Sequence, residues 1–234
     1  MPSTVDAAIL CGGQGTRLRS LGLDVPKSMA PIRGRPFLEL LVGELARQGV
    51  GRIVLCTGYR REAIRAHFSG ADWGVPLAFS EETAPLGTAG ALRQALDQLR
   101  GDPLLVMNGD SYTPFDLAAL QACERDTRAE AIMVVAPAGD RRDAGVIAVD
   151  AAGWVRDFAE KTPRPDAAFH SAGIYLLRRR VLESLPPGVA ASLEFDVLPR
   201  LVPGRAAAVL AGGEIVDIGT PERLMWAQER LAGL

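Results

Sequence analysis

The sequence predicts an α/β fold built on a mainly parallel sheet. Short apolar runs alternate with longer segments whose apolar residues recur at helical spacing, and this alternation is typical of strands joined by crossover helices. Apolar residues make up 48% of the 234 residues, enough for a sizeable core. The length predicts one domain over residues 1–234, with a larger part over about 1–140 and a smaller lobe over about 141–234.

The expected elements of the larger part follow from local patterns. The run at 6–10 is apolar and leads into a glycine-rich loop, whereas 36–48 places Phe37, Leu41 and Leu45 on one helical face. The apolar run at 103–107 leads directly into Asn-Gly-Asp. The strands expected in this part are 6–10, 52–56, 76–79, 103–107 and 130–136. The helices expected in it are 36–48, 60–68, 88–100 and 117–128.

Beyond about residue 140 the pattern changes. Residues 145–149, 154–158 and 169–177 read as strands separated by short turns, which indicates a more antiparallel region. The remaining elements expected here are strands at 206–210 and 214–218 and a final helix at 221–231. Thr220 before Pro221 is the better candidate for the cap of that helix than Asp217.

Composition excludes several classes of protein. A formal net charge of −2 gives no general attraction to nucleic acid. No apolar run reaches the roughly 18 residues that a membrane helix needs, so no membrane partner is expected. The first residues carry no basic segment of a secretory signal, and three widely spaced cysteines fit neither a disulfide framework nor a zinc site. A cytoplasmic location is therefore expected.

The loop after the first expected strand is a candidate phosphate-binding loop. It contains Gly12, Gly13 and Gly15, followed by Thr16 and Arg17. Ligands of open parallel sheets bind beyond the carboxyl ends of the strands, where glycines let backbone N–H groups approach a phosphate. Leu18 stands where a dinucleotide fingerprint needs a glycine, and the Gly-Lys-Ser/Thr of a Walker loop is absent. A plain glycine-rich turn is the alternative interpretation.

Lysine is rare in this chain. Only two of the 26 basic residues are lysine, Lys27 and Lys161, so each is a candidate for a site that needs a compact ammonium rather than a guanidinium. Lys27 lies between Pro26 and Pro31, ten residues past Arg17, and is expected to return to the glycine loop. A solvated surface lysine is the alternative.

These motifs resemble those of the nucleotidyltransferases that activate sugar 1-phosphates. The family signature is similar to the Gly-Gly-x-Gly-Thr-Arg-Leu of this glycine loop followed by Pro26-Lys27. The stretch from Glu82 to Gly90 resembles the nucleotide-contacting loop of the family. Asn108-Gly109-Asp110, Phe158-Ala159-Glu160-Lys161 and Asp217-Ile218-Gly219-Thr220-Pro221 resemble its metal-binding and sugar-phosphate motifs, in the same order. The resemblance implies a Rossmann-like fold of the nucleotide-diphospho-sugar transferase type.

The resemblance assigns roles residue by residue. It places the nucleotide in the first part of the chain and the sugar, with the second metal ligand, in the smaller lobe. Arg17 and Lys27 are expected to be catalytic, holding the triphosphate, and Asp110 and Asp217 to bind Mg²⁺. The expected nucleotide-binding residues are Leu10, Gly12, Gly13, Gly15, Thr16, Glu82, Pro85, Gly87 and Thr88. The expected substrate-binding residues are Asn108, Gly109, Gly145, Glu160, Lys161 and Gly173.

The metal assignment also has a physical basis. Asp110 follows an apolar strand, so its carboxylate would be costly to bury without a partner. A divalent cation between Asp110 and Asp217 would satisfy both, and Mg²⁺ commonly takes one or two protein carboxylates with phosphate oxygens and water. A turn residue is the alternative for Asp110, and a helix cap is the alternative for Asp217.

The expected substrates are a nucleoside triphosphate and a sugar 1-phosphate. The Pro-Leu-Gly-Thr-Ala-Gly loop resembles that of guanylyl-transferring members, and the stretch at 8–39 resembles those that act on D-glycero-α-D-manno-heptose 1-phosphate. The chain departs from that pattern at Ser28 and at Ser171-Ala172, near the expected sugar. A mannose- or other hexose-1-phosphate enzyme and a catalytically silent regulatory paralogue are the alternatives. A homo-oligomer is left open.

Three further residues have structural interpretations. Cys11 lies in the glycine loop, but no histidine is near it in sequence and the resemblance implies no covalent intermediate, so a structural role is expected. His67 is expected on a helix surface. His170 is expected to be structural, with contact to the sugar as the alternative.

Overall fold

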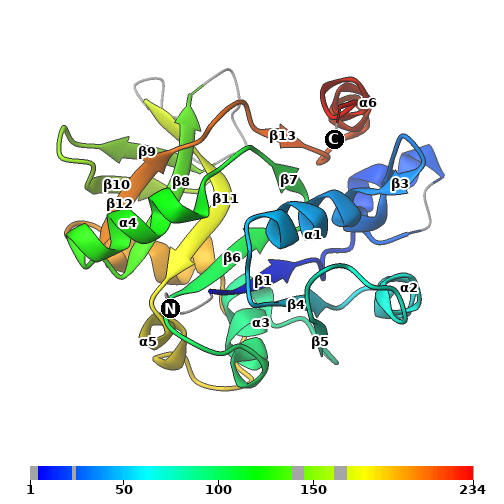
Figure 1. The fold of residues 1–234 in the computed structure, drawn as a ribbon, viewed down its shortest axis with the longest axis horizontal. Helices are drawn as coiled ribbons and strands as arrows, with labels where there is room; N and C mark the ends of the chain where they lie inside the picture. Colours follow the sequence, from blue (N-terminus) through cyan, green and yellow to red (C-terminus); the bar gives the residue numbers. More distant parts are fainter. Residues whose placement is uncertain (1–4, 23–24, 139–144, 161–167, 234) are drawn as a thin grey trace.

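A nine-stranded sheet runs through the computed structural model, with helices against both of its faces (Figure 1). The structure describes residues 5–22, 25–138, 145–160 and 168–233. The strands in order across the sheet are β10 (Val155–Ala159), β9 (Val146–Val149), β11 (Phe169–Leu177), β6 (Leu104–Asn108), β1 (Asp6–Leu10), β4 (Arg52–Thr57) and β5 (Leu77–Glu81). β8 (Ala131–Pro137) pairs with β11, and β12 (Ala206–Leu210) pairs with β8.

Strand direction divides the sheet as the sequence pattern predicts. β6, β1, β4 and β5 run parallel to one another, and β12 runs parallel to β8. β11 is antiparallel to β6, β8 and β9, and β10 is antiparallel to β9. The predicted α/β class and the more antiparallel region beyond residue 140 are therefore confirmed. β11 also joins the two parts of the chain, because it pairs with strands from both.

Alternate strand residues supply two separate cores. In β4, Ile53 and Leu55 face one core while Val54 and Cys56 face the other, as the two-residue period of a strand requires. The first core is completed by helices α1 (Phe37–Arg47), α2 (Arg61–Phe68), α4 (Leu117–Thr127) and α6 (Pro221–Arg230). The second is completed by α3 (Gly87–Ala95), α5 (Arg179–Glu183), the π-helical turn η4 (Leu193–Val197) and the 3-10 turn η5 (Leu198–Leu201). Burial on both faces explains the continuous apolar runs of the central strands.

Shorter elements surround the carboxyl ends of the parallel strands. These are η1 (Thr16–Leu21), η2 (Lys27–Met29), the hairpin of β2 (Pro31–Ile32) and β3 (Arg35–Pro36), and a two-stranded sheet of β7 (Ser111–Tyr112) and β13 (Val216–Asp217). A further 3-10 turn, η3 (Leu96–Gln98), directly follows α3. The strand expected at 214–218 is thus only two residues long, because it pairs with β7 outside the main sheet. The helix expected at 88–100 changes to a 3-10 turn after Ala95.

The last helix begins as its sequence predicts. Thr220 is the N-cap of α6, its hydroxyl accepts a hydrogen bond from the Arg223 N–H at 3.3 Å, and Pro221 takes the first helical position. Figure 1 shows α6 beside β13, close to the carboxyl terminus. The cap therefore fixes the angle at which the chain leaves β13 and enters the helix.

Replacing this cap is expected to weaken the fold. Thr220→Ala should lower the free energy of unfolding by about 1 kcal/mol, because one N–H of the first helical turn loses its acceptor. Thr220→Ser keeps the hydroxyl and should stay near the wild type. Urea unfolding of the three proteins measures the effect, and equal stability of the alanine and serine variants would contradict the assigned cap.

Candidate active site

Two cavities open beside the carboxyl ends of β1, β4 and β6. The larger has a volume of about 700 Å³ and the smaller about 440 Å³. Lys27, Asn108 and Asp110 line both of them. This is the edge of a parallel sheet at which ligands are expected to bind, and the shared wall means that molecules in the two cavities would meet at Asp110 and Lys27.

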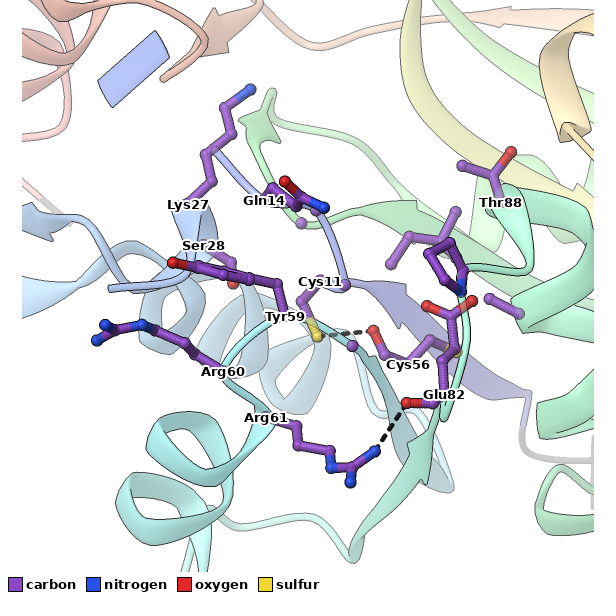
Figure 2. A pocket seen from close by; sticks show the side chains of 18 of the residues that line it. Cys11, Gln14, Lys27, Ser28, Cys56, Tyr59, Arg60, Arg61, Glu82 and Thr88 are labelled. Atoms are coloured by element: carbon purple, nitrogen blue, oxygen red, sulfur yellow. Dashed lines mark hydrogen bonds between the residues drawn. The ribbon is translucent and has the colours of Figure 1, made fainter. Parts of the chain in front are cut away.

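The larger cavity is formed by the glycine loop and the loops after β4 and β5. Figure 2 shows Tyr59 on one wall and Glu82 on the opposite wall, with Cys11 between them. The glycine loop is joined to the end of β6 by a hydrogen bond from Gly109 N–H to the Leu10 carbonyl at 2.9 Å. The predicted nucleotide-binding residues in its wall are Leu10, Gly12, Gly13, Glu82, Pro85, Gly87 and Thr88.

The Glu82 carboxylate is held at a defined position in this cavity. One oxygen, Oε1, accepts the Leu86 N–H at 2.8 Å. The other oxygen, Oε2, lies against the backbone of Gly12 and Gly58. A Cβ on Gly12 would come within 2.8 Å of this oxygen and a Cβ on Gly58 within 3.0 Å, so both positions need glycine. Burial raises the pKa of the Glu82 carboxyl above its ordinary value, and the bond from Leu86 opposes that shift. The wall therefore presents an oriented hydrogen-bond acceptor.

Lys27 reaches the shared wall from the short turn η2. Its Nζ contacts Asp110 Oδ2 at 2.6 Å, and its side chain is 20% exposed. The glycine loop passes directly beside it: Gly15 has φ +58°, and a Cβ there would come within 2.9 Å of the Lys27 Cβ. Gly15 therefore meets both a steric and a conformational requirement. It lines neither cavity itself, and Thr16 also lies outside both walls.

The two predicted metal ligands are brought together by the small sheet. β13 pairs with β7 so that Asp217 lies opposite Ser111, and the Ile218 N–H donates to the Asp110 carbonyl at 3.0 Å. Asp217 is buried; its Oδ1 accepts the Gly219 N–H at 2.7 Å, and Arg223 Nη1 lies 3.3 Å from each of its oxygens. Both aspartates line the smaller cavity.

This pair of carboxylates fits the predicted ion. Across the described ranges, no group of three or more His, Cys, Asp or Glu side chains is placed to hold a metal. Mg²⁺ does not need such a group, because it binds through one or two carboxylates and completes its shell with phosphate oxygens and water. Two aspartates in the wall of one cavity are consistent with that preference.

The smaller cavity contains the predicted sugar-side residues. Gly145, Glu160 and Gly173 line it, together with Arg17, which was expected to hold the triphosphate and does not line the larger cavity. A Cβ on Gly145 would come within 2.6 Å of Glu160 Oε2 and 3.1 Å of the Phe158 ring, so this glycine makes room for the Glu160 carboxylate. Gly145 is expected to bind substrate, and the neighbour that its missing side chain admits in the structure is the Glu160 carboxylate. Lys161, the second rare lysine, lies outside the described residues.

Gly173 forms a bulge in β11 beneath this cavity. Its φ is +71°, and the pairing register of β11 with β8 shifts between Ser171 and Tyr175. A Cβ on Gly173 would come within 2.8 Å of Asn108 Nδ2. The glycine thus allows Asn108 to lie against the bulge, at the wall that both cavities share.

Several wall residues were not predicted from the sequence. Glu194 lines the smaller cavity from η4 and accepts a hydrogen bond from the Thr88 hydroxyl at 2.8 Å, so that hydroxyl already has a partner. Arg223 approaches from the first turn of α6. Tyr59 reaches the larger cavity from the turn after β4. The position of Arg223, six residues after Asp217 and just past a helix cap, was the one sequence signal available for this group.

Cys11 has the surroundings of a structural residue, and His67 and His170 line neither cavity. Cys11 is buried, its thiol donates to the Cys56 carbonyl at 3.2 Å, and burial raises its pKa well above the ordinary value. A thiol that stays protonated is a poor nucleophile. His170 is buried in β11, and His67 lies on α2 with its Nε2 2.6 Å from Glu39 Oε1.

In the part of the chain that is described, no helix is long and apolar enough to span a membrane.

Comparisons with known proteins agree on one family. The family model described as Nucleotidyl transferase matches residues 6–233. The chain is 36% identical over 222 residues to a mannose-1-phosphate guanylyltransferase of Mycobacterium tuberculosis, covering 93% of this chain and 62% of that protein. It is 32% identical over 218 residues to a D-glycero-alpha-D-manno-heptose 1-phosphate guanylyltransferase of Campylobacter jejuni, covering 93% of this chain and 96% of that protein.

A solved structure shows the same fold. HddC from Yersinia pseudotuberculosis superposes with a TM-score of 0.85 at 30% identity, covering 97% of this chain and 100% of that chain. Its complex with GMP-PN superposes with a TM-score of 0.83. The family model, full-length relatives and the superposition together show that this chain belongs to the nucleotidyl transferase family.

Proposed function

We propose that this protein transfers a guanylyl group from GTP to a sugar 1-phosphate, giving a GDP-sugar and pyrophosphate. The observation that carries the proposal is the pair of cavities meeting at Lys27 and Asp110. A reaction between two phosphate-bearing substrates needs one site for each, with their reacting phosphates side by side against a shared set of charged groups.

The wall of the larger cavity favours guanine as the base. Guanine presents adjacent N–H donors on its N1 and its amino group, and the Glu82 carboxylate offers acceptor oxygens at a fixed position. Adenine has no donor at N1, so it can offer this half-buried carboxylate one hydrogen bond fewer than guanine, at a cost of about 1 kcal/mol. The complex of HddC with GMP-PN, a protein of the same fold and 30% identity, also supports a guanine nucleotide.

D-glycero-α-D-manno-heptose 1-phosphate is the proposed acceptor. Relatives named for this substrate match this chain over nearly their whole length, 96% of one and 98% of another. Mannose 1-phosphate is the second candidate, favoured by the 36% identity to the mycobacterial enzyme, of which the chain covers 62%. Both candidates predict the same phosphate chemistry and differ only in the sugar.

The chain needs no nucleophile of its own, because a phosphate oxygen of the acceptor attacks the α-phosphorus in line. Lys27 and Arg17 would neutralise the triphosphate oxygens and stabilise the departing pyrophosphate. Glu160 would accept hydrogen bonds from sugar hydroxyls, with Lys161 beside the incoming phosphate. A Mg²⁺ ion, when bound, would be held by Asp110 and Asp217 and would supply further positive charge at the reacting phosphates.

The direct test is a substrate panel. Pyrophosphate release is measured with Mg²⁺ for the four nucleoside triphosphates, each paired with the 1-phosphates of D-glycero-α-D-manno-heptose, mannose, glucose and N-acetylglucosamine. We expect a signal with GTP and the heptose phosphate. Pyrophosphate release only with mannose 1-phosphate would show that mannose 1-phosphate is the acceptor instead. No release with any pair would favour the catalytically silent regulatory paralogue.

Removing the Asp110 charge is expected to abolish most turnover. Asp110→Asn should lower kcat at least about 100-fold, since both Lys27 and the proposed ion lose a charged partner at the reacting phosphates. Asp97→Asn, an exposed aspartate of η3, is the matched control and should keep wild-type kcat. Circular dichroism verifies folding, and a folded Asp110→Asn with near wild-type kcat would rule out the assignment.

Neutralising Glu82 is expected to change base selection. Glu82→Gln replaces one acceptor oxygen by an amide donor, so the preference for GTP over ATP in kcat/KM should fall about 10- to 100-fold. Glu81→Gln is the matched control, because Glu81 pairs with Arg65 on α2 rather than facing the cavity. An unchanged GTP preference in Glu82→Gln would show that another group reads the base.

A further inference from the structure

Each of the two aspartates in the smaller cavity has its own cation. Lys27 Nζ contacts Asp110 Oδ2 at 2.6 Å, and Arg223 Nη1 lies 3.3 Å from both oxygens of Asp217. The Lys27 partner belongs to a predicted motif, whereas the Arg223 partner does not. The predicted motifs therefore explain the cation beside Asp110 but not the cation beside Asp217, which is Arg223.

The position of Arg223 is electrostatically unusual. It lies in the first turn of α6, directly after the Thr220 cap, where the backbone N–H groups already create positive potential. A guanidinium in this turn is disfavoured unless an anion compensates it. The buried carboxylate of Asp217 is such an anion in the ligand-free protein, and the same potential would favour a phosphate placed there.

The Asp217 carboxylate and the two cations, Lys27 and Arg223, all lie close to Gly219. A Cβ built on Gly219 would come within 2.8 Å of Asp217 Oδ1, 3.5 Å of Lys27 Nζ and 3.6 Å of Arg223 Nη1. Any larger residue would occupy the space that the two cations and the carboxylate share. Arg17 also lines this cavity, so three basic side chains surround a space next to two carboxylates.

We propose that Arg223 is an exchangeable counter-ion. In the free protein it neutralises Asp217; when a divalent cation binds Asp217, the guanidinium turns to a phosphate oxygen of a substrate in the smaller cavity. The identity of that substrate, a sugar 1-phosphate, rests on the proposed function. Arg223 therefore competes with the metal ion for Asp217 and afterwards binds phosphate together with it.

Arg223→Gln separates these two effects without requiring turnover. The free protein should bind Mn²⁺, followed by electron paramagnetic resonance, about three- to tenfold more tightly, because a partly exposed competing charge is gone. The Mg²⁺-saturated protein should bind inorganic phosphate, followed by calorimetry, about tenfold more weakly, because a charge-assisted hydrogen bond is lost. Arg223→Lys keeps the charge and should restore much of both properties.

Arg230→Gln is the matched control. Arg230 lies in the same helix, pairs with Glu214 at 3.9 Å, is 57% exposed and lines neither cavity, so both affinities should stay at wild-type values. If thermal melting shows that Arg223→Gln is unfolded, Arg223→Met, which has a long uncharged side chain, replaces it in both titrations.

The outcomes distinguish this inference from the proposed function. Unchanged Mn²⁺ affinity in the folded uncharged variant would overturn the inference, and so would unchanged phosphate affinity. Both titrations use only Mn²⁺, Mg²⁺ and inorganic phosphate. The expected shifts in a protein that proved inactive across the substrate panel would therefore support the counter-ion role while the proposed function failed.

Discussion

The antiparallel pairing of β7 with β13 is the contact on which the site depends. It places Asp217 opposite Ser111, and Ile218 N–H donates to the Asp110 carbonyl at 3.0 Å. The two carboxylates come from distant parts of the chain, and one of them is buried. Because both must be in place before a cation or a phosphate can be held between them, the site forms only when the two parts of the chain have folded onto each other.

Close backbone approaches complete this arrangement. The Glu82 carboxylate lies over the backbones of Gly12 and Gly58, and the Glu160 carboxylate lies against Gly145. In each case a charged acceptor is positioned where a side chain would otherwise stand. Rigid placement of this kind orients hydrogen-bonding groups before the substrate arrives, which reduces the reorganisation needed for binding and for catalysis. The glycines of the two cavities therefore contribute to the site because their missing side chains leave room for these carboxylates.

The strands of the sheet and the site motifs could be predicted from the sequence, but the tertiary contacts between the side chains of the site could not. Strands such as β1, β4 and β6 are buried on both faces, so their apolar runs are unambiguous. η4 and η5 are too short for a periodic signal, and proline-containing stretches interrupt the region before and within them. Glu194 was missed for a related reason, because its relevance comes from the tertiary neighbour that it contacts. Arg223 had only its place just past a helix cap as a signal, and that place does not reveal that it contacts Asp217.

The two cations beside the aspartates differ in a way that the rarity of lysine helps to explain. The Lys27 ammonium is a compact charge that contacts Asp110 through Oδ2, whereas Arg223 Nη1 is shared between both oxygens of Asp217. An ammonium can neutralise a carboxylate while leaving its other oxygen open to a second partner; a guanidinium placed between two oxygens covers both. In a chain that uses arginine for 24 of its 26 basic residues, lysine at position 27 therefore keeps Asp110 accessible. Access to Asp217, by contrast, depends on the movement of Arg223.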